Sequence, residues 1–263
     1  QPSEDINVML PNNVANLLGD YGGVMNLDVS NVQHPGWFAN HASVEDEKLL
    51  LNGVGEWQSF AGQELKLTEG TAIFIRYRYT PDAEFTINME RGEWDTDSFK
   101  SWRLNQVGGL NAIYGREWRD YPYYARYFKG DYIPLADQWI DVLFVVNYDA
   151  EFITYLWETA YPTHAAIFRR QFDGDWRNLD WGLAFNINQG QISIAKSTTI
   201  AFDQPVAISE IDQHYWIAVN AMMDGDIDLA FNELNVAQEL NPDSADIFDR
   251  RAQLMWNTGN IDG

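Results

Sequence analysis

The sequence predicts a mainly β protein: an antiparallel sandwich of two sheets with an α-helical hairpin at its C-terminus. From Gly22 to about Asp203, short runs of residues alternate between apolar and polar side chains, which is the period of a half-buried strand. Turn residues separate these runs and no helical period interrupts them, which is typical of an all-β sandwich or barrel. After Pro205 the apolar residues recur at every third or fourth position, which predicts helices from about Ile211.

These patterns divide the chain into three parts. Residues 1–21 are polar with one short helix-like stretch, and we expect an arm that lies on the domain. Residues 22–205 form the predicted sandwich, and residues 211–263 form the predicted helices.

Several strands can be placed within the predicted sandwich. Residues 73–79 and 85–89 alternate on either side of a turn at 80–83, which predicts a hairpin of two adjacent strands. Residues 142–147 form a nearly continuous apolar run, so we expect a strand buried on both faces, with residues 152–157 as its hairpin partner. The predicted closing strands are 182–188, 191–194 and 198–202.

The composition excludes some classes of function. The net charge of −22 opposes binding to the phosphate backbone of a nucleic acid or to an anionic membrane surface. No apolar run reaches the roughly 20 residues of a membrane span. The absence of cysteine excludes disulfides, thiolate metal sites and a cysteine nucleophile.

The chain begins at Gln1 rather than methionine, so either a signal segment was removed or the sequence starts inside a longer chain, and we favour export. The predicted location is extracellular, periplasmic or at the cell surface. Sandwiches of this type are common outside cells.

Small residues, glycine and proline recur at a fixed spacing in the C-terminal segment. The residues concerned are Ala218, Gly225, Ala230, Leu234, Ala237 and Pro242, with Ala252 and Gly259 one period later. This pattern resembles a tetratricopeptide repeat, which pairs antiparallel helices with a period of about 34 residues. Two departures are Ala221, where the family prefers a large aromatic residue, and Trp216, which lies off the usual tryptophan position. The resemblance implies one repeat, the first helix of a second, and a protein partner.

Two segments near the ends of the β region have a residue pattern similar to that of a known sandwich family. Residues 36–38 carry a Gly-Trp-Phe run before the strand pair at 44–51, where Glu47 replaces the usual glycine. Residues 181–187 and 194–202 look like paired closing strands. The β region therefore resembles the concanavalin-like jelly roll in its laminin-G-like or family-16-hydrolase-like branch. This fold hosts lectins, hydrolases and adhesion domains, so it implies little about function.

No catalytic motif is evident. A retaining glycosidase needs two carboxylates about 5 Å apart, and no strand carries them at suitable spacing. None of the four histidines lies in a nucleophile or zinc motif. If the chain is a glycan-active enzyme, its carboxylate pair comes from Glu90, Glu93 and Glu117.

Aromatic and planar polar side chains are the candidates for ligand binding. The chain has 11 Trp, 13 Tyr and 14 Phe, and most of these are expected in the core. The stretch 105–131 is aromatic-rich and lacks clean alternation, so we expect a long irregular connection of the kind that often carries function. If the polar sides of 73–79 and 85–89 share one concave surface, they supply groups that bind hydroxyls or carboxylates. The candidates are Arg76, Arg78, Asn88 and Glu90, with Trp94, Trp102, Trp118, Tyr121, Tyr123 and Tyr124 as stacking partners.

A structural Ca²⁺ is possible, because the resembled family often keeps one near its first and last strands. Asp28 and Asp203 lie at those places in the sequence, and no other cofactor is expected.

The combined prediction is a non-catalytic binding module of an exported or cell-surface protein. Its ligand is predicted to be a carbohydrate or surface glycan, bound on an aromatic-rich concave face, while the helices contact a protein. Two alternatives stay open: a glycoside hydrolase-like enzyme on the same fold, and a structural subunit of a surface assembly.

Overall fold

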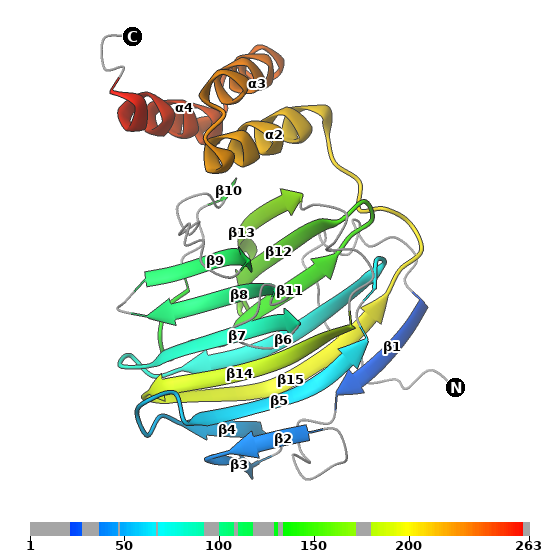
Figure 1. The fold of residues 1–263 in the computed structure, drawn as a ribbon, viewed down its shortest axis with the longest axis vertical. Coiled ribbons are helices and arrows are strands. Elements are labelled where there is room, and N and C mark those ends of the chain that lie inside the picture. The colour runs from blue at the N-terminus through cyan, green and yellow to red at the C-terminus, as the bar shows by residue number, and fades with distance from the viewer. Residues whose placement is uncertain are drawn as a thin grey trace.

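The strands of this chain form two antiparallel sheets that stack as a sandwich, and three helices follow (Figure 1). The computed structural model describes residues 22–27, 37–46, 48–66, 68–91, 100–107, 110–117, 129–130, 134–171 and 180–259. The predicted two-sheet sandwich with C-terminal helices is confirmed within these ranges.

Within the described residues, one sheet has nine strands and the other has six. The nine-stranded sheet contains β1 (Gly22–Leu27), β3 (Ala42–Glu45), β4 (Lys48–Asn52), β6 (Thr71–Tyr79), β10 (Lys129–Gly130), β11 (Ile140–Val146), β12 (Glu151–Glu158), β13 (Tyr161–Gln171) and β15 (Gln191–Ala201). The six-stranded sheet contains β2 (Trp37–Asn40), β5 (Ser59–Lys66), β7 (Glu84–Arg91), β8 (Lys100–Val107), β9 (Leu110–Glu117) and β14 (Asp180–Gln189). The helices are α2 (Glu210–Asp224), α3 (Ile227–Leu240) and α4 (Ala245–Thr258).

The hairpin predicted for residues 73–79 and 85–89 is wrong, because β6 and β7 lie in different sheets. β6 pairs with β11 and β15, whereas β7 pairs with β8 and β14. The chain crosses from one sheet to the other at 80–83, and the rings of Tyr77 and Tyr79 contact Phe85 across the core at 5.7 and 5.1 Å. A hairpin and this crossing give the same alternation of side chains, so the sequence pattern alone does not distinguish them.

Other strand predictions have mixed outcomes. β11 is buried at every position and pairs with β12, as expected for a strand covered on both faces. The irregular connection predicted for 105–131 is wrong wherever the structure describes this stretch, because residues 105–107, 110–117 and 129–130 belong to the paired strands β8, β9 and β10. The rest of the stretch lies outside the described residues.

The helices begin and end at residues with good capping chemistry. Ser209 caps α2 by accepting a hydrogen bond from the Asp212 amide, and Ser244 occupies the N-cap position of α4. Gly225 and Gly259 follow α2 and α4 with φ of 81° and 71°, which glycine adopts without steric cost.

The small residues Ala218, Ala230 and Ala237 are fully buried. The tetratricopeptide relationship itself stays a prediction. None of the helices in the described ranges is long and apolar enough to cross a membrane.

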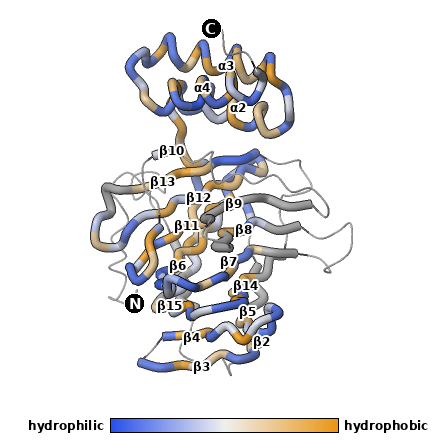
Figure 2. The backbone as a smooth tube through the Cα atoms, turned by 90° about the vertical axis from the view of Figure 1, so that its left-hand side faces the viewer, coloured by the Kyte–Doolittle hydropathy of each residue, from blue (hydrophilic) through white to orange (hydrophobic). Residues whose placement is uncertain are grey.

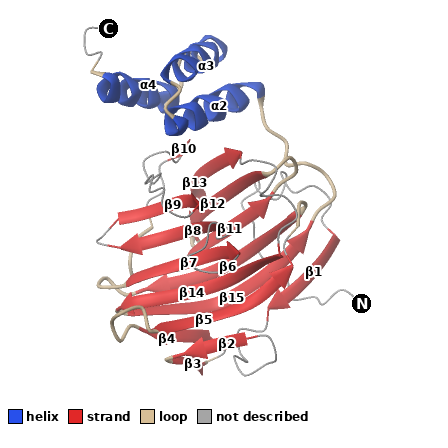
Figure 3. Ribbon diagram, in the orientation of Figure 1, coloured by secondary structure: helices blue, strands red, loops and turns tan. Residues whose placement is uncertain are grey.

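All three helices gather at the β13 end of the sandwich (Figure 2, Figure 3). On the side of β13 that faces away from β12, the two-residue strand β10 pairs with only two of its positions. The guanidinium of Arg170 on β13 donates hydrogen bonds to Asp224 at 2.7 Å and to Asn220 at 3.3 Å, both on α2. α2 therefore covers a strand edge that would otherwise present unpaired backbone groups.

The hydrophobic core continues from the sandwich into the helices without a break. Trp102 of β8 contacts Phe168 of β13 at a ring-centroid distance of 5.3 Å, and Phe168 contacts Trp216 of α2 at 5.9 Å. Trp216 then meets Tyr215 edge to face at 5.1 Å. This series of rings, which we call the aromatic chain, fixes the helices to the sheets.

Trp216→Ala is expected to lower the free energy of unfolding by about 3–5 kcal/mol, because it removes a large buried side chain from the aromatic chain. Trp256→Ala is the matched control, since Trp256 is 75% exposed on α4 whereas Trp216 is 4% exposed. The control is expected to change stability by no more than about 0.5 kcal/mol. Urea unfolding followed by circular dichroism measures both, and equal losses would contradict this role for Trp216.

Candidate functional site

The two outer faces of the sandwich differ in chemistry. On the nine-stranded sheet part of the outer face is a buried apolar cluster that includes Phe74, Leu143, Ile153 and Trp157. The charged side chains of Arg76, Arg78 and Asp141 lie on the same face. On the six-stranded sheet the described side chains of the outer face are polar or small, apart from Phe60. A polar face with buried members is the informative exception in a sandwich, so it is the candidate functional face.

The pairing of β5, β14, β7 and β8 aligns the polar side chains in rows. One row crosses the sheet as Gly62, Ala184, Asn88 and Arg103, and the adjacent row crosses as Phe60, Asn186 and Thr86. We call these seven residues the polar face.

Several polar side chains of the polar face are buried to an unusual degree. Asn88 is 3% exposed, and Arg103 and Thr86 are each 7% exposed. At the end of the face, the Asn188 side chain donates to Glu84 at 2.9 Å and accepts from the Trp57 amide at 3.3 Å. Burial of polar groups costs free energy unless they are hydrogen-bonded, so such groups on an outer face indicate a role beyond solvation.

The predicted binding residues on β6 and β7 do not share a surface. Asn88 lies on the polar face, but Arg76 and Arg78 lie on the outer face of the opposite sheet, because the chain crosses the sandwich between them. Arg76 forms a bidentate pair with Asp141 at 2.7 and 2.9 Å, and this hydrogen bonding raises the pKa of Arg76 above its ordinary value. The guanidinium of Arg78 lies over the Trp139 ring at 5.7 Å.

The predicted stacking residues are placed only in part. Trp102 is fully buried in the core and donates its indole N–H to Thr154 at 2.7 Å, so it offers no platform to a ligand. The remaining stacking candidates lie outside the described residues, and they are Trp94, Trp118, Tyr121, Tyr123 and Tyr124.

The candidate carboxylates are also placed in part. Glu90 is paired with Ser101 of β8, and Glu117 is paired with Lys100 of β8, so the two stand on strands that β8 separates. Glu93 and Asp28 lie outside the described residues. Asp203 is exposed in the connection after β15, and no group of three potential metal ligands occurs in the ranges that the structure describes.

Sequence reasoning missed Thr86, Arg103 and Asn186. The strand that carries Arg103 was not predicted, although Trp102 and Leu104 alternate with polar residues there. That alternation was the available signal. Nothing local indicates that Asn186 and Arg103 share a face, because β7 lies between their strands.

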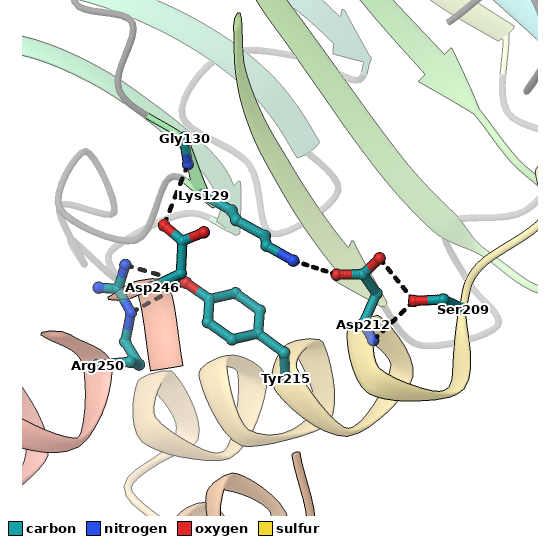
Figure 4. Close-up of polar contacts among 7 residues, drawn as sticks. All are labelled: Lys129, Gly130, Ser209, Asp212, Tyr215, Asp246 and Arg250. Atoms are coloured by element: carbon teal, nitrogen blue, oxygen red, sulfur yellow. Dashed lines mark hydrogen bonds and ion pairs between the residues drawn. The ribbon is translucent and has the colours of Figure 1, made fainter. Parts of the chain in front are cut away.

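A second polar cluster lies where the helices meet the sandwich (Figure 4). Lys129 of β10 forms an ion pair with Asp212 of α2, and the Ser209 hydroxyl donates to the same carboxylate at 2.8 Å. The Gly130 amide donates to Asp246 of α4 at 3.5 Å. Lys129 also lies over the Tyr215 ring at 5.2 Å. This cluster attaches β10 to two helices.

Comparisons with known proteins find similar folds only. No family model and no curated protein matches the chain. Lectin II from Ulex europaeus has a TM-score of 0.48 at 8% identity, covering 70% of this chain and 100% of its own. The Ca²⁺-bound exoplasmic/lumenal domain of VIP36 has a TM-score of 0.49 at 7% identity, covering 69% and 91%. A xylan β-1,4-xylosidase from Bacillus halodurans has a TM-score of 0.40 at 11% identity, covering 68% and 39%. All three scores lie below 0.5, so the assignment of a function depends on this chain's own residues.

The Asp212 carboxylate generates a pH prediction. Burial raises the pKa of Asp212, but hydrogen bonds from Lys129 and Ser209 together outweigh burial and hold the pKa below its ordinary value. Because the folded-state pKa is depressed, the stabilisation is present above the unfolded-state pKa of about 3.9 and is lost as pH falls through the folded-state pKa. Asp212→Asn is therefore expected to be less stable than the parent at pH 7, with the difference shrinking as the medium is acidified.

Urea midpoints measured at neutral and acidic pH test this expectation. Asp82→Asn, at an exposed position of the turn at 80–83, is the control for the removal of one negative charge. A stability difference for Asp212→Asn that does not change with pH would refute the assignment.

Proposed function

We propose that this chain is a non-catalytic binding module that holds a carbohydrate on the polar face. The observation that supports the proposal is the burial of Thr86, Asn88 and Arg103 on the outside of a sheet. Binding sites use a few precisely placed polar groups rather than many solvated ones.

The chemistry of these groups suits vicinal hydroxyls. Asn88 and Asn186 each offer a carbonyl acceptor and an amide donor on one plane, and Thr86 offers a hydroxyl that does both. Arg103 offers a rigid fork of donors. Gly62 and Ala184 lie in the same row and have almost no side chain.

The charge of the chain favours a neutral ligand. A net charge of −22 opposes an anion at long range, and the described side chains of the polar face contribute only the single positive charge of Arg103. A neutral glycan pays no such electrostatic cost.

The exported or cell-surface location and a structural Ca²⁺ belong to the same proposal. So does a protein partner for the helices, which is supported by exposed apolar side chains on α4: Phe248 and Trp256.

Asn88→Ala and Arg103→Met are each expected to weaken glycan binding at least about tenfold, since each removes hydrogen bonds from a buried site. Binding to a glycan array identifies a ligand, and calorimetry with that ligand measures the two variants. Melting temperatures and near-UV circular dichroism establish that each variant is folded.

Arg78→Met is the matched control for Arg103→Met, because Arg78 lies on the outer face of the opposite sheet. It is expected to bind as the parent does, and it also tests the sequence-based prediction for Arg78. If Arg78→Met lost binding while both polar-face variants kept it, the ligand site would lie on the other sheet. Turnover of the bound glycan would contradict a non-catalytic role.

A further inference from the structure

A cavity of about 340 Å³ lies between the β13 edge of the sandwich and α2. We call it the junction groove, and its lining includes Lys129, Tyr155, Arg169, Ser209, Asp212 and Trp216. The volume falls within the roughly 300–1,000 Å³ range of small-molecule sites. Its residues come from the sheet, from the connection after β15 and from two helices, so the groove exists only when the helices are docked.

Tyr155 lines the junction groove although the residue as a whole is only 1% exposed. It packs in the apolar cluster on the outer face of the nine-stranded sheet. Burial raises the pKa of Tyr155, and Arg169, Glu151 and Asp212 are the charged groups that act on it. The hydroxyl is therefore a neutral group, able to donate and accept, that lies beside this cavity.

The surrounding polar groups are held in place by their neighbours and keep hydrogen-bonding groups that these contacts do not use. Arg169 forms a bidentate pair with Glu151 at 2.7 and 2.8 Å, which uses two of its five N–H donors. Asp212 is held by Lys129 and Ser209. Groups fixed by neighbours in this way bind a ligand at low entropic cost.

The charged side chains that line the junction groove are evenly divided. Lys129 and Arg169 carry two positive charges and Asp212 and Asp246 carry two negative charges, while Glu151, which pairs with Arg169, adds one negative charge beside the groove. A divalent cation prefers six or more oxygen ligands, and no cluster of three candidate metal ligands is found among the described residues. An anion meets two carboxylates in a strongly acidic chain.

Trp216 adds an aromatic wall to this set. An aromatic wall with fixed donors and acceptors of balanced charge is suited to a neutral ring that carries several hydroxyls.

We propose that the junction groove binds a neutral sugar residue, with the Tyr155 hydroxyl hydrogen-bonded to a sugar hydroxyl. The ligand class follows the proposed function, but the site is separate from the polar face. The helices thereby complete a second sugar site in addition to covering the strand edge.

Nuclear magnetic resonance of the full chain tests the site directly. The probes are the methyl glycosides of glucose, galactose and mannose, titrated one at a time. The δ1 methyl groups of Ile167 and Ile208 line the junction groove and report on it, while the side-chain amides of Asn88 and Asn186 report on the polar face. One glycoside is expected to shift the Ile167 and Ile208 signals in a saturable manner.

Tyr155→Phe separates binding from structure. It is expected to weaken that binding about fivefold, the effect of one neutral hydrogen bond, while leaving the melting temperature close to that of the parent because the ring keeps its place in the apolar cluster. Tyr148→Phe is the matched control, since Tyr148 lines the neighbouring cavity and its hydroxyl donates to the Phe202 carbonyl at 3.2 Å. It should bind the glycoside as the parent does.

The outcomes distinguish the two proposals. Shifts at the Ile167 and Ile208 methyls without shifts at the amides support the groove and count against the polar face. Shifts at the amides alone overturn the groove and support the polar face, and shifts at neither overturn both. Unchanged affinity in Tyr155→Phe overturns the role of its hydroxyl. Stronger methyl shifts with inorganic phosphate or Ca²⁺ overturn the assignment to a neutral sugar.

Discussion

The contact between Phe168 and Trp216 is the interaction on which the architecture depends. A sandwich of open sheets has strand edges, and β13 has only two residues of β10 on one side. α2 covers that edge, and Phe168 joins Trp102 in the sheets to Trp216 in the helix within one buried cluster. The continuity of this core explains why the helices hold a fixed position against the sandwich and why a cavity with defined walls can form beside them.

The crossing of the chain between the sheets determines which residues can act together. Because β6 and β7 belong to different sheets, the polar sides of the two strands point to opposite outer faces. One of these faces is closed by an apolar cluster that includes Phe202 and Val206 from the connection after β15. The other carries buried amide and guanidinium groups. The difference between the outer faces of the two sheets therefore follows from the crossing of the chain at residues 80–83.

Sequence reasoning recovers features that are set locally. A nearly continuous apolar run identifies β11, with β12 as its hairpin partner, and the period of two identifies the core side of β7. The period of three to four with capping residues identifies α2 and its end at Gly225. It does not recover pairing, because alternation is the same in a hairpin and in a crossing. Trp102 shows the same limit, since the sequence around a tryptophan does not distinguish a core residue from one that stacks on a ligand. Asp212 meets Tyr155 and Arg169 only through the docking of α2, so no local pattern predicts the junction groove.

Native-state hydrogen exchange tests the continuous core most directly. If the aromatic chain makes sandwich and helices one cooperative unit, the slowest amides of α2 exchange with the same opening free energy as the slowest amides of β12 and β13. That free energy should also equal the global free energy of unfolding. Helix amides that exchange with a much lower opening free energy, while β12 and β13 stay protected, would contradict the account.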